Sequence, residues 1–168
     1  LTTDFTPSTG EVGAAGQIGA TTGGVNFTAT PTFTDFGEDI DNCPKNMKEF
    51  KRQDMVDAKM SGTFINADTK TAKLLCGAAD IDASDTTKVV PRTDLKDSDF
   101  TDIWLVGDYS DKNGTKNGGF IAIHMLNALS TGGFQLKTAD KAKGQFAFEF
   151  TAHYSLAEQD KVPYEIYI

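Results

Sequence analysis

The segment Val25-Asn-Phe-Thr-Ala-Thr-Pro-Thr-Phe-Thr34 alternates apolar and polar side chains over its whole length. A period of two is typical of a strand with one buried face, and the polar partners here are mostly β-branched threonines. Pro31 cannot donate a hydrogen bond to a neighbouring strand, so we predict that this strand lies at a sheet edge or carries a bulge. The pattern indicates a mainly β protein.

Other parts of the chain extend this prediction. Phe146, Phe148 and Phe150 fall on one face of a strand, and Pro163 places the last strand at an edge. One helix is predicted from about Asp68 to Ala79, with Asp68 or Thr69 as its cap. Residues 44–52 are predicted as a short helix or a loop. Seven further strands are predicted at 55–66, 86–92, 103–106, 120–129, 134–138, 145–154 and 162–168. The predicted fold class is mainly β (α+β), a β-sandwich or barrel with one packed α-helix.

Composition and charge exclude some function classes. The chain has 168 residues, which suits a single domain, and its 16 cations against 24 carboxylates give a net charge of −8. A general nucleic-acid binder would need a basic patch, and this balance argues against one. No apolar run is long enough to span a membrane. The charge is uneven, because no Lys or Arg precedes Lys45. Cys43 and Cys76 are interpreted as buried free thiols.

Residues 1–24 are rich in Gly, Thr, Ala and Ser, and they carry few sizeable apolar groups. Such a stretch cannot bury enough surface to fold alone, so we predict a flexible N-terminal arm ahead of a single domain at 25–168. Two alternatives stay open for it, a free tail or an arm that becomes ordered on a partner subunit. Its regularly spaced glycines are Gly10, Gly13, Gly16 and Gly19.

The sequence offers little that points to catalysis. His124 and His153 lie in apolar strand segments, where a histidine is usually a core or interface residue. Neither a nucleophile elbow nor a phosphate-binding loop occurs in the sequence. The acidic stretches 35–41 and 80–85 lack the calcium-loop pattern and are interpreted as solvated loops. We therefore expect no enzyme activity, no cofactor and no metal site.

Several short motifs in the same order resemble major tail proteins, the tail tube proteins of long-tailed phages and prophages of Gram-positive bacteria. The resemblance covers roughly residues 25–168. The motifs that carry it are Phe33-Thr-Asp-Phe-Gly-Glu-Asp-Ile-Asp-Asn-Cys-Pro44, Asp99-Phe100, Ile103-Trp-Leu-Val-Gly-Asp-Tyr-Ser110, Ala128-Leu-Ser-Thr-Gly-Gly-Phe134, Lys143-Gly-Gln-Phe146 and Val162-Pro-Tyr-Glu165.

The resemblance implies a virion structural protein with a tail-tube β-sandwich. Copies of such a protein self-assemble into hexameric rings, and the rings stack into a tube that conducts DNA. The implied partners are other copies of the chain, tape-measure and tail terminator proteins, and DNA as transiting cargo, with no membrane. The implied location is the virion tail, after synthesis in the bacterial host cytoplasm.

In that family an N-terminal arm and a long inter-strand loop make contacts between rings. Here these roles would map to residues 1–24 and to Ser110–Gly119, or to Asp35–Arg52. The corresponding candidate assembly residues are the four spaced glycines together with Asp35, Glu38, Asp39, Asp41, Lys112, Asn113, Gly114, Asn117 and Gly118. The acidic net charge suits a conduit that repels phosphates.

Two other functions compete with the tail tube. A β-sandwich binding module, for carbohydrate or baseplate-type adhesion, would present exposed aromatic side chains on one flat face. A hydrolase using acidic residues is a third alternative. The exposure of Trp104 discriminates between the first two, since a buried Trp104 favours the tube and an exposed one favours the binding module.

Overall fold

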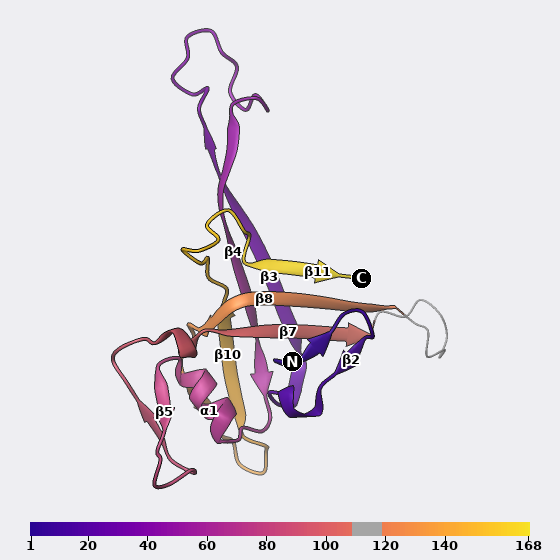
Figure 1. Ribbon diagram of the computed structural model, residues 1–168, viewed down its shortest axis with the longest axis vertical. Helices are drawn as coiled ribbons and strands as arrows, with labels where there is room; N and C mark the ends of the chain where they lie inside the picture. The colour runs from indigo at the N-terminus through magenta and orange to yellow at the C-terminus, as the bar shows by residue number, and fades with distance from the viewer. Residues whose placement is uncertain (109–118) are drawn as a thin grey trace.

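A computed structural model of the chain describes residues 1–108 and 119–168, and it is mainly antiparallel β-sheet with one α-helix (Figure 1). This confirms the predicted fold class. All eight predicted strands are present, and β1, β2 and β5 are short additions. The strands are β1 Phe5–Thr6, β2 Glu11–Val12, β3 Thr21–Asp35, β4 Lys51–Phe64, β5 Ala79–Ile81, β6 Val89–Pro91, β7 Thr101–Asp108, β8 Phe120–Ser130, β9 Gln135–Lys137, β10 Gln145–Thr151 and β11 Tyr164–Tyr167; the helix is α1 Thr69–Cys76, and two 3-10 turns are η1 Ala14–Gly16 and η2 Asp97–Asp99.

The main sheet has the strand order β11-β8-β10-β4-β3, with β7 also paired to β8 and β9 also paired to β10. In Figure 1 β7, β8 and β11 run across the direction of β3, β4 and β10. One sheet is therefore bent so that its two parts cross. Two further hairpins, β1–β2 and β5–β6, are attached to it.

The bend lies in β8, at Asn127. Residues 122–125 of β8 pair with both β7 and β11, whereas Leu129 and Ser130 pair with β10. Between them Asn127 adopts a left-handed conformation with φ of 48°, which Asn tolerates better than most residues. Its backbone N–H donates to Asp102 Oδ1 at 2.9 Å, and its Nδ2 donates to the His153 carbonyl at 3.3 Å. These bonds stabilise the point where β8 changes partners.

The hydrophobic core lies between the crossing parts of the sheet. Phe64 of β4 and Phe150 of β10 are fully buried, together with Met60, Leu75, Ile103 and Met125. Phe148 stacks on Phe64 with 4.4 Å between ring centroids, and Phe146 packs at the rim of the same cluster. The predicted shared face of the three β10 phenylalanines is thus confirmed.

Helix α1 closes one side of this core with Leu75. Asp68 is its N-cap, as predicted, and Oδ1 of Asp68 accepts a hydrogen bond from the Thr71 N–H at 2.7 Å. The predicted end at Ala79 is wrong, because Gly77 turns the chain with φ of 75° and Ala79 already belongs to β5. Residues 44–50 form turns, and β4 begins at Lys51.

Replacing Asp68 by alanine is expected to lower the free energy of unfolding by about 1 kcal/mol. The Thr71 N–H lowers the pKa of Asp68 below its ordinary value. A folded pKa below the unfolded one stabilises the protein above the unfolded pKa, and this stabilisation disappears as pH falls through the folded pKa. Urea titrations from neutral to acidic pH should therefore show the wild-type advantage shrinking, with Asp160→Ala as an exposed control. A difference in the free energy of unfolding between wild type and Asp68→Ala that stays unchanged in strong acid would contradict the capping role.

Both proline-marked strands are edges, as predicted. Strand β3 with Pro31 pairs only with β4, and β11, which follows Pro163, pairs only with β8. They occupy the two opposite ends of the strand order. Each therefore leaves one row of backbone groups without a strand partner in the described part of the chain.

The N-terminal segment differs most from expectation, because it packs on the chain's own sheet. Thr2 pairs with Trp104 through two backbone hydrogen bonds of 2.7 and 3.0 Å, and Phe5 lies 5.2 Å from the Trp104 ring. Ile18 joins the main core. The expected boundary at residue 24 falls inside β3. The few apolar side chains of residues 1–24 are enough to order this segment, because they pack against the face of the main sheet rather than against each other.

Candidate assembly surfaces

The β3–β4 hairpin projects well beyond the rest of the protein (Figure 1). Strand β10 pairs with β4 only over Lys59–Phe64, whereas β3 continues to pair with β4 as far as Asp35 and Lys51. The outer half of the hairpin is therefore a two-stranded ribbon without a third strand. Such ribbons are at best marginally stable on their own in water.

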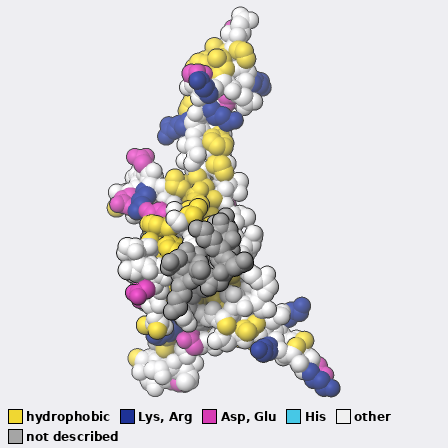
Figure 2. Space-filling view, turned by 90° about the vertical axis from the view of Figure 1, so that its right-hand side faces the viewer, with side chains coloured by type: hydrophobic (Ala, Val, Ile, Leu, Met, Phe, Trp, Pro, Cys, Tyr) yellow, Lys and Arg dark blue, Asp and Glu magenta, His cyan; other side chains and the backbone are white. Residues whose placement is uncertain are grey.

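Apolar side chains are exposed along this projection, as Figure 2 also shows. We call residues 33–55 the hairpin tip. The exposed apolar side chains of the hairpin tip are Phe33, Phe36, Ile40, Met47 and Met55. Phe36 has 58% of its surface exposed, at the start of the tip loop. Contiguous exposed apolar surface marks interaction sites in soluble proteins, so the hairpin tip is the strongest candidate contact surface in the described residues.

The four predicted acidic residues lie together at this tip, and they differ in role. Asp35 accepts hydrogen bonds from the Asn46 and Gly37 N–H groups, both at 2.9 Å. These bonds, that from Asn46 first, lower the pKa of Asp35, so Asp35 shapes the turn. Glu38 pairs with Lys45 at 3.2 Å. Asp39 and Asp41 are exposed and have no side-chain partner among the residues described.

The four spaced glycines are in contact with their own chain. A side chain at Gly13 or Gly16 would collide with Asp4, and a Cβ at Gly19 would come within 3.1 Å of Phe64. Gly10 lies next to Phe120. Their spacing thus reflects tight folding of the N-terminal segment, and their role in assembly stays a prediction.

The remaining candidate residues are in the loop between β7 and β8. Lys112, Asn113, Gly114, Asn117 and Gly118 all fall within 109–118, outside the described residues.

Both histidines are half-buried and outside the two core clusters, and one of them belongs to a cluster that the sequence does not reveal. His124 stacks on Trp104 with ring centroids 3.8 Å apart and planes at 6°. Its Nε2 lies 3.4 Å from Asp102 Oδ2, and its Nδ1 lies 3.5 Å from Glu165 Oε2. His153 Nδ1 lies 3.2 Å from the Asn127 carbonyl. The cross-strand register of Trp104, His124 and Glu165 creates the cluster, which ties β7, β8 and β11 together.

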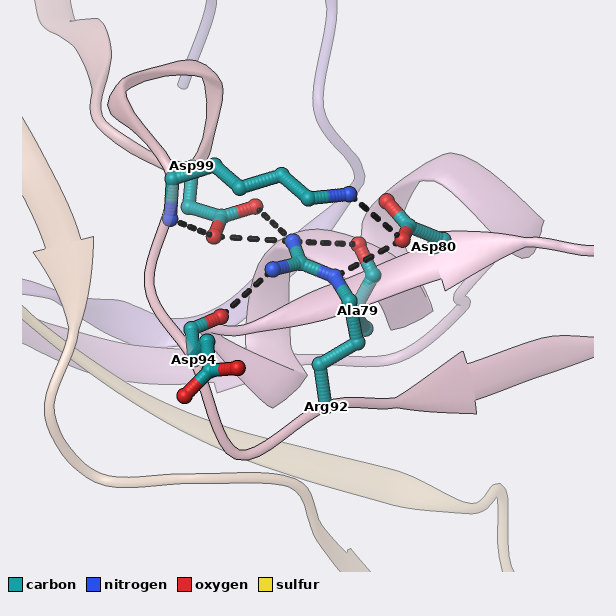
Figure 3. A network of polar contacts seen from close by, with 6 residues as sticks. Ala79, Asp80, Arg92, Asp94 and Asp99 are labelled. Carbon is teal, nitrogen blue, oxygen red and sulfur yellow. Dashed lines mark hydrogen bonds and ion pairs between the residues drawn. The ribbon is translucent and has the colours of Figure 1, made fainter.

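An ion-pair network with Asp99 at its buried end fixes the β5–β6 hairpin to the turn that precedes β7 (Figure 3). Arg92 Nη2 contacts both carboxylate oxygens of Asp99, at 2.6 and 2.8 Å, and its Nε lies 2.8 Å from Asp80 Oδ2. Lys96 Nζ also pairs with Asp80. Burial alone would raise the pKa of Asp99, but the Lys96 N–H and the Arg92 guanidinium outweigh it and lower the pKa. The network is structural.

In the acidic stretch 80–85, two carboxylates accept hydrogen bonds from backbone N–H groups two residues further along the chain. Asp82 Oδ1 accepts from the Ser84 N–H at 2.9 Å, and Asp85 Oδ1 accepts from the Thr87 N–H at 3.0 Å. Within residues 1–108 and 119–168, no group of three His, Cys, Asp or Glu side chains is arranged to hold a metal ion.

The described residues also contain one sizeable cavity and two free cysteines. A cavity of about 490 Å³ lies between α1, the N-terminal segment and η2, lined among others by Ile18, Lys70, Leu74 and Asp99. Both cysteines are free, as predicted, but half-buried rather than buried, with Cys43 in the hairpin tip and Cys76 at the end of α1. Across the described ranges, no helix combines the length and apolarity that a membrane crossing requires.

The exposure of Trp104 discriminates between the competing functions. Only 8% of its surface is exposed, because Phe5 and Tyr167 pack around it. Trp104, whose exposure would favour a binding module, is therefore covered in part by the N-terminal segment. Comparison of the chain with models of known protein families and with curated proteins finds no match.

Proposed function

We propose that this chain is a structural protein that assembles with copies of itself, of the phage tail-tube type, in which stacked hexameric rings form a conduit for DNA. The observation that supports this most strongly is the hairpin tip, a projecting ribbon whose apolar side chains have no cover within the described residues. In a monomer the apolar side chains of this ribbon stay in contact with water, whereas a second copy can bury them.

The edge strands β3 and β11 support the same proposal. Strands β3 and β11 end the strand order on opposite sides, so one edge of a copy can pair with the other edge of the next. Contacts between two different surfaces are heterologous and close into rings or continue into filaments. Ile166 on β11 is half-exposed and lies opposite Ile123 of β8, which adds an apolar face at that edge.

The net charge supports a conduit that does not hold its cargo. At −8 the protein repels the phosphates of DNA at long range. The buried position of Trp104 weakens the alternative of a carbohydrate or adhesion module.

The experiment is a double substitution at the hairpin tip, Phe36→Asp with Ile40→Asp. Wild-type protein at millimolar concentration is expected to form rings or tubes in electron micrographs and fast-sedimenting species in the ultracentrifuge. The variant is expected to remain monomeric, because burying two carboxylates in the contact surface costs a large desolvation free energy. Leu156→Asp with Leu95→Asp is the matched control, since both leucines are exposed away from the tip.

Far-ultraviolet circular dichroism checks that all three proteins are folded. A wild-type protein that remains monomeric at every concentration would refute the proposed function. A double variant that assembles like wild type would remove the hairpin tip from the contact.

A further inference from the structure

A second exposed apolar patch lies at the end of the protein opposite the hairpin tip. Phe146 of β10 pairs with Phe64, the last residue of β4, and in Figure 1 this end of β10 lies far from the projecting hairpin. Phe134 and Leu136 are about half-exposed there, and Phe134 packs on Phe146 with 5.9 Å between ring centroids. We call residues 134–146 the basic turn.

Charge distinguishes the basic turn from the hairpin tip. The basic turn carries Lys137, Lys141 and Lys143 against the single carboxylate of Asp140. All three lysines are exposed, and none has an ion-pair partner in the described parts of the chain. The hairpin tip, residues 33–55, contains six carboxylates and four cations, a net charge of −2, whereas the basic turn has a net charge of +2.

We infer that the hairpin tip of one copy docks on the basic turn of a second copy, with Asp39 and Asp41 facing Lys141 and Lys143. This inference rests on the proposed function and names the surface that receives the tip. Each surface combines exposed apolar side chains with charges that lack partners, and the two net charges are opposite in sign. Docking buries Phe36 and Ile40 against Phe134 and Leu136, which a monomer leaves half-exposed.

The positions of the two surfaces fit an assembly that continues. The hairpin tip and the basic turn lie at opposite ends of the β3–β4 direction (Figure 1). A copy whose hairpin tip is docked on a second copy therefore still has its own basic turn available for the hairpin tip of a third copy. A contact of this heterologous kind stacks copies without limit. The competing receptor at the same end is the β5–β6 hairpin, and its loop presents Asp82 and Asp85, which repel an acidic tip.

The test is a pair of charge reversals used separately and together. The tip variant is Asp39→Lys with Asp41→Lys, and the turn variant is Lys141→Asp with Lys143→Asp. Each variant alone places like charges across the contact, so its association is expected to weaken by roughly tenfold or more. In an equal mixture every tip meets a turn of opposite charge, so elongation is expected to return. Glu11→Lys with Asp160→Lys is the control for the tip variant, because it makes the same change in net charge at exposed positions elsewhere.

Sedimentation velocity and electron microscopy measure the length of the assemblies, and circular dichroism checks folding. Variants that elongate like wild type, or a mixture that fails to recover, would overturn the docking of the tip on the basic turn while leaving the proposed function intact. Wild-type protein that never associates would overturn both.

Discussion

Phe64→Ala is expected to lower the free energy of unfolding by about 4 kcal/mol. The Phe64 ring is fully buried and stacks on Phe148 at the centre of the core, where β4 meets β10. Removing it leaves a cavity that strands paired on both sides cannot close, so lost burial and lost packing add. Urea unfolding followed by the fluorescence of the single tryptophan, Trp104, measures the change.

Phe33→Ala is the matched control for this prediction. It removes the same ring from the same hairpin, but at the tip, where Phe33 is 48% exposed and its ring centroid lies 5.3 Å from Lys51 Nζ. Its cost in the monomer should stay below about 1 kcal/mol. Equal losses for the two variants would mean that Phe64 does not lie in a rigid core.

Asp99→Ala is expected to cost about 2 kcal/mol, because it removes the buried carboxylate that Arg92 Nη2 contacts, although Arg92 Nε keeps its pair with Asp80. The double variant Arg92→Met with Asp99→Leu should recover part of that loss, since it removes both charges together. Lys45→Ala is the control, and breaking its exposed pair with Glu38 should cost less than about 1 kcal/mol. Thermal unfolding of the four proteins measures these differences.

The contribution of this pair also depends on pH. Because the folded pKa of Asp99 lies below its ordinary value, the charged carboxylate stabilises the protein above the unfolded pKa and ceases to do so as pH falls through the folded pKa. The difference between wild type and Asp99→Ala should therefore narrow in acid. A difference that widens on acidification would assign Asp99 another role.

Local patterns were sufficient to predict eight of the eleven described strands and the start of the helix, but not β1, β2, β5 or the end of the helix. Alternation located β3 and β10, the Asp68 cap located the start of α1, and the two prolines placed β3 and β11 at edges, because each signal depends on neighbours in the chain. Contacts between distant segments carry no such signal. The sequence could not show that Phe5 would cover Trp104, nor that His124 would face Asp102 and Glu165.

The candidate surfaces were predictable only in part. The acidic residues of the tip were recognised as a cluster from their spacing, but the projection depends on where β10 stops pairing with β4, which alternation does not encode. The three lysines of the basic turn carry no sequence signal of a contact surface, because their position opposite the hairpin tip follows only from the pairing of β10 with β4. The predictions for residues 109–118 stay predictions.

The pairing of Thr2 with Trp104 also has a consequence during synthesis on the ribosome. The two partners are separated by about a hundred residues, and the face that receives Phe5 needs β8 and β11 as well. Thr2 and Phe5 therefore cannot take up their packed positions until β11 has left the ribosome. Non-local pairing of this kind slows folding.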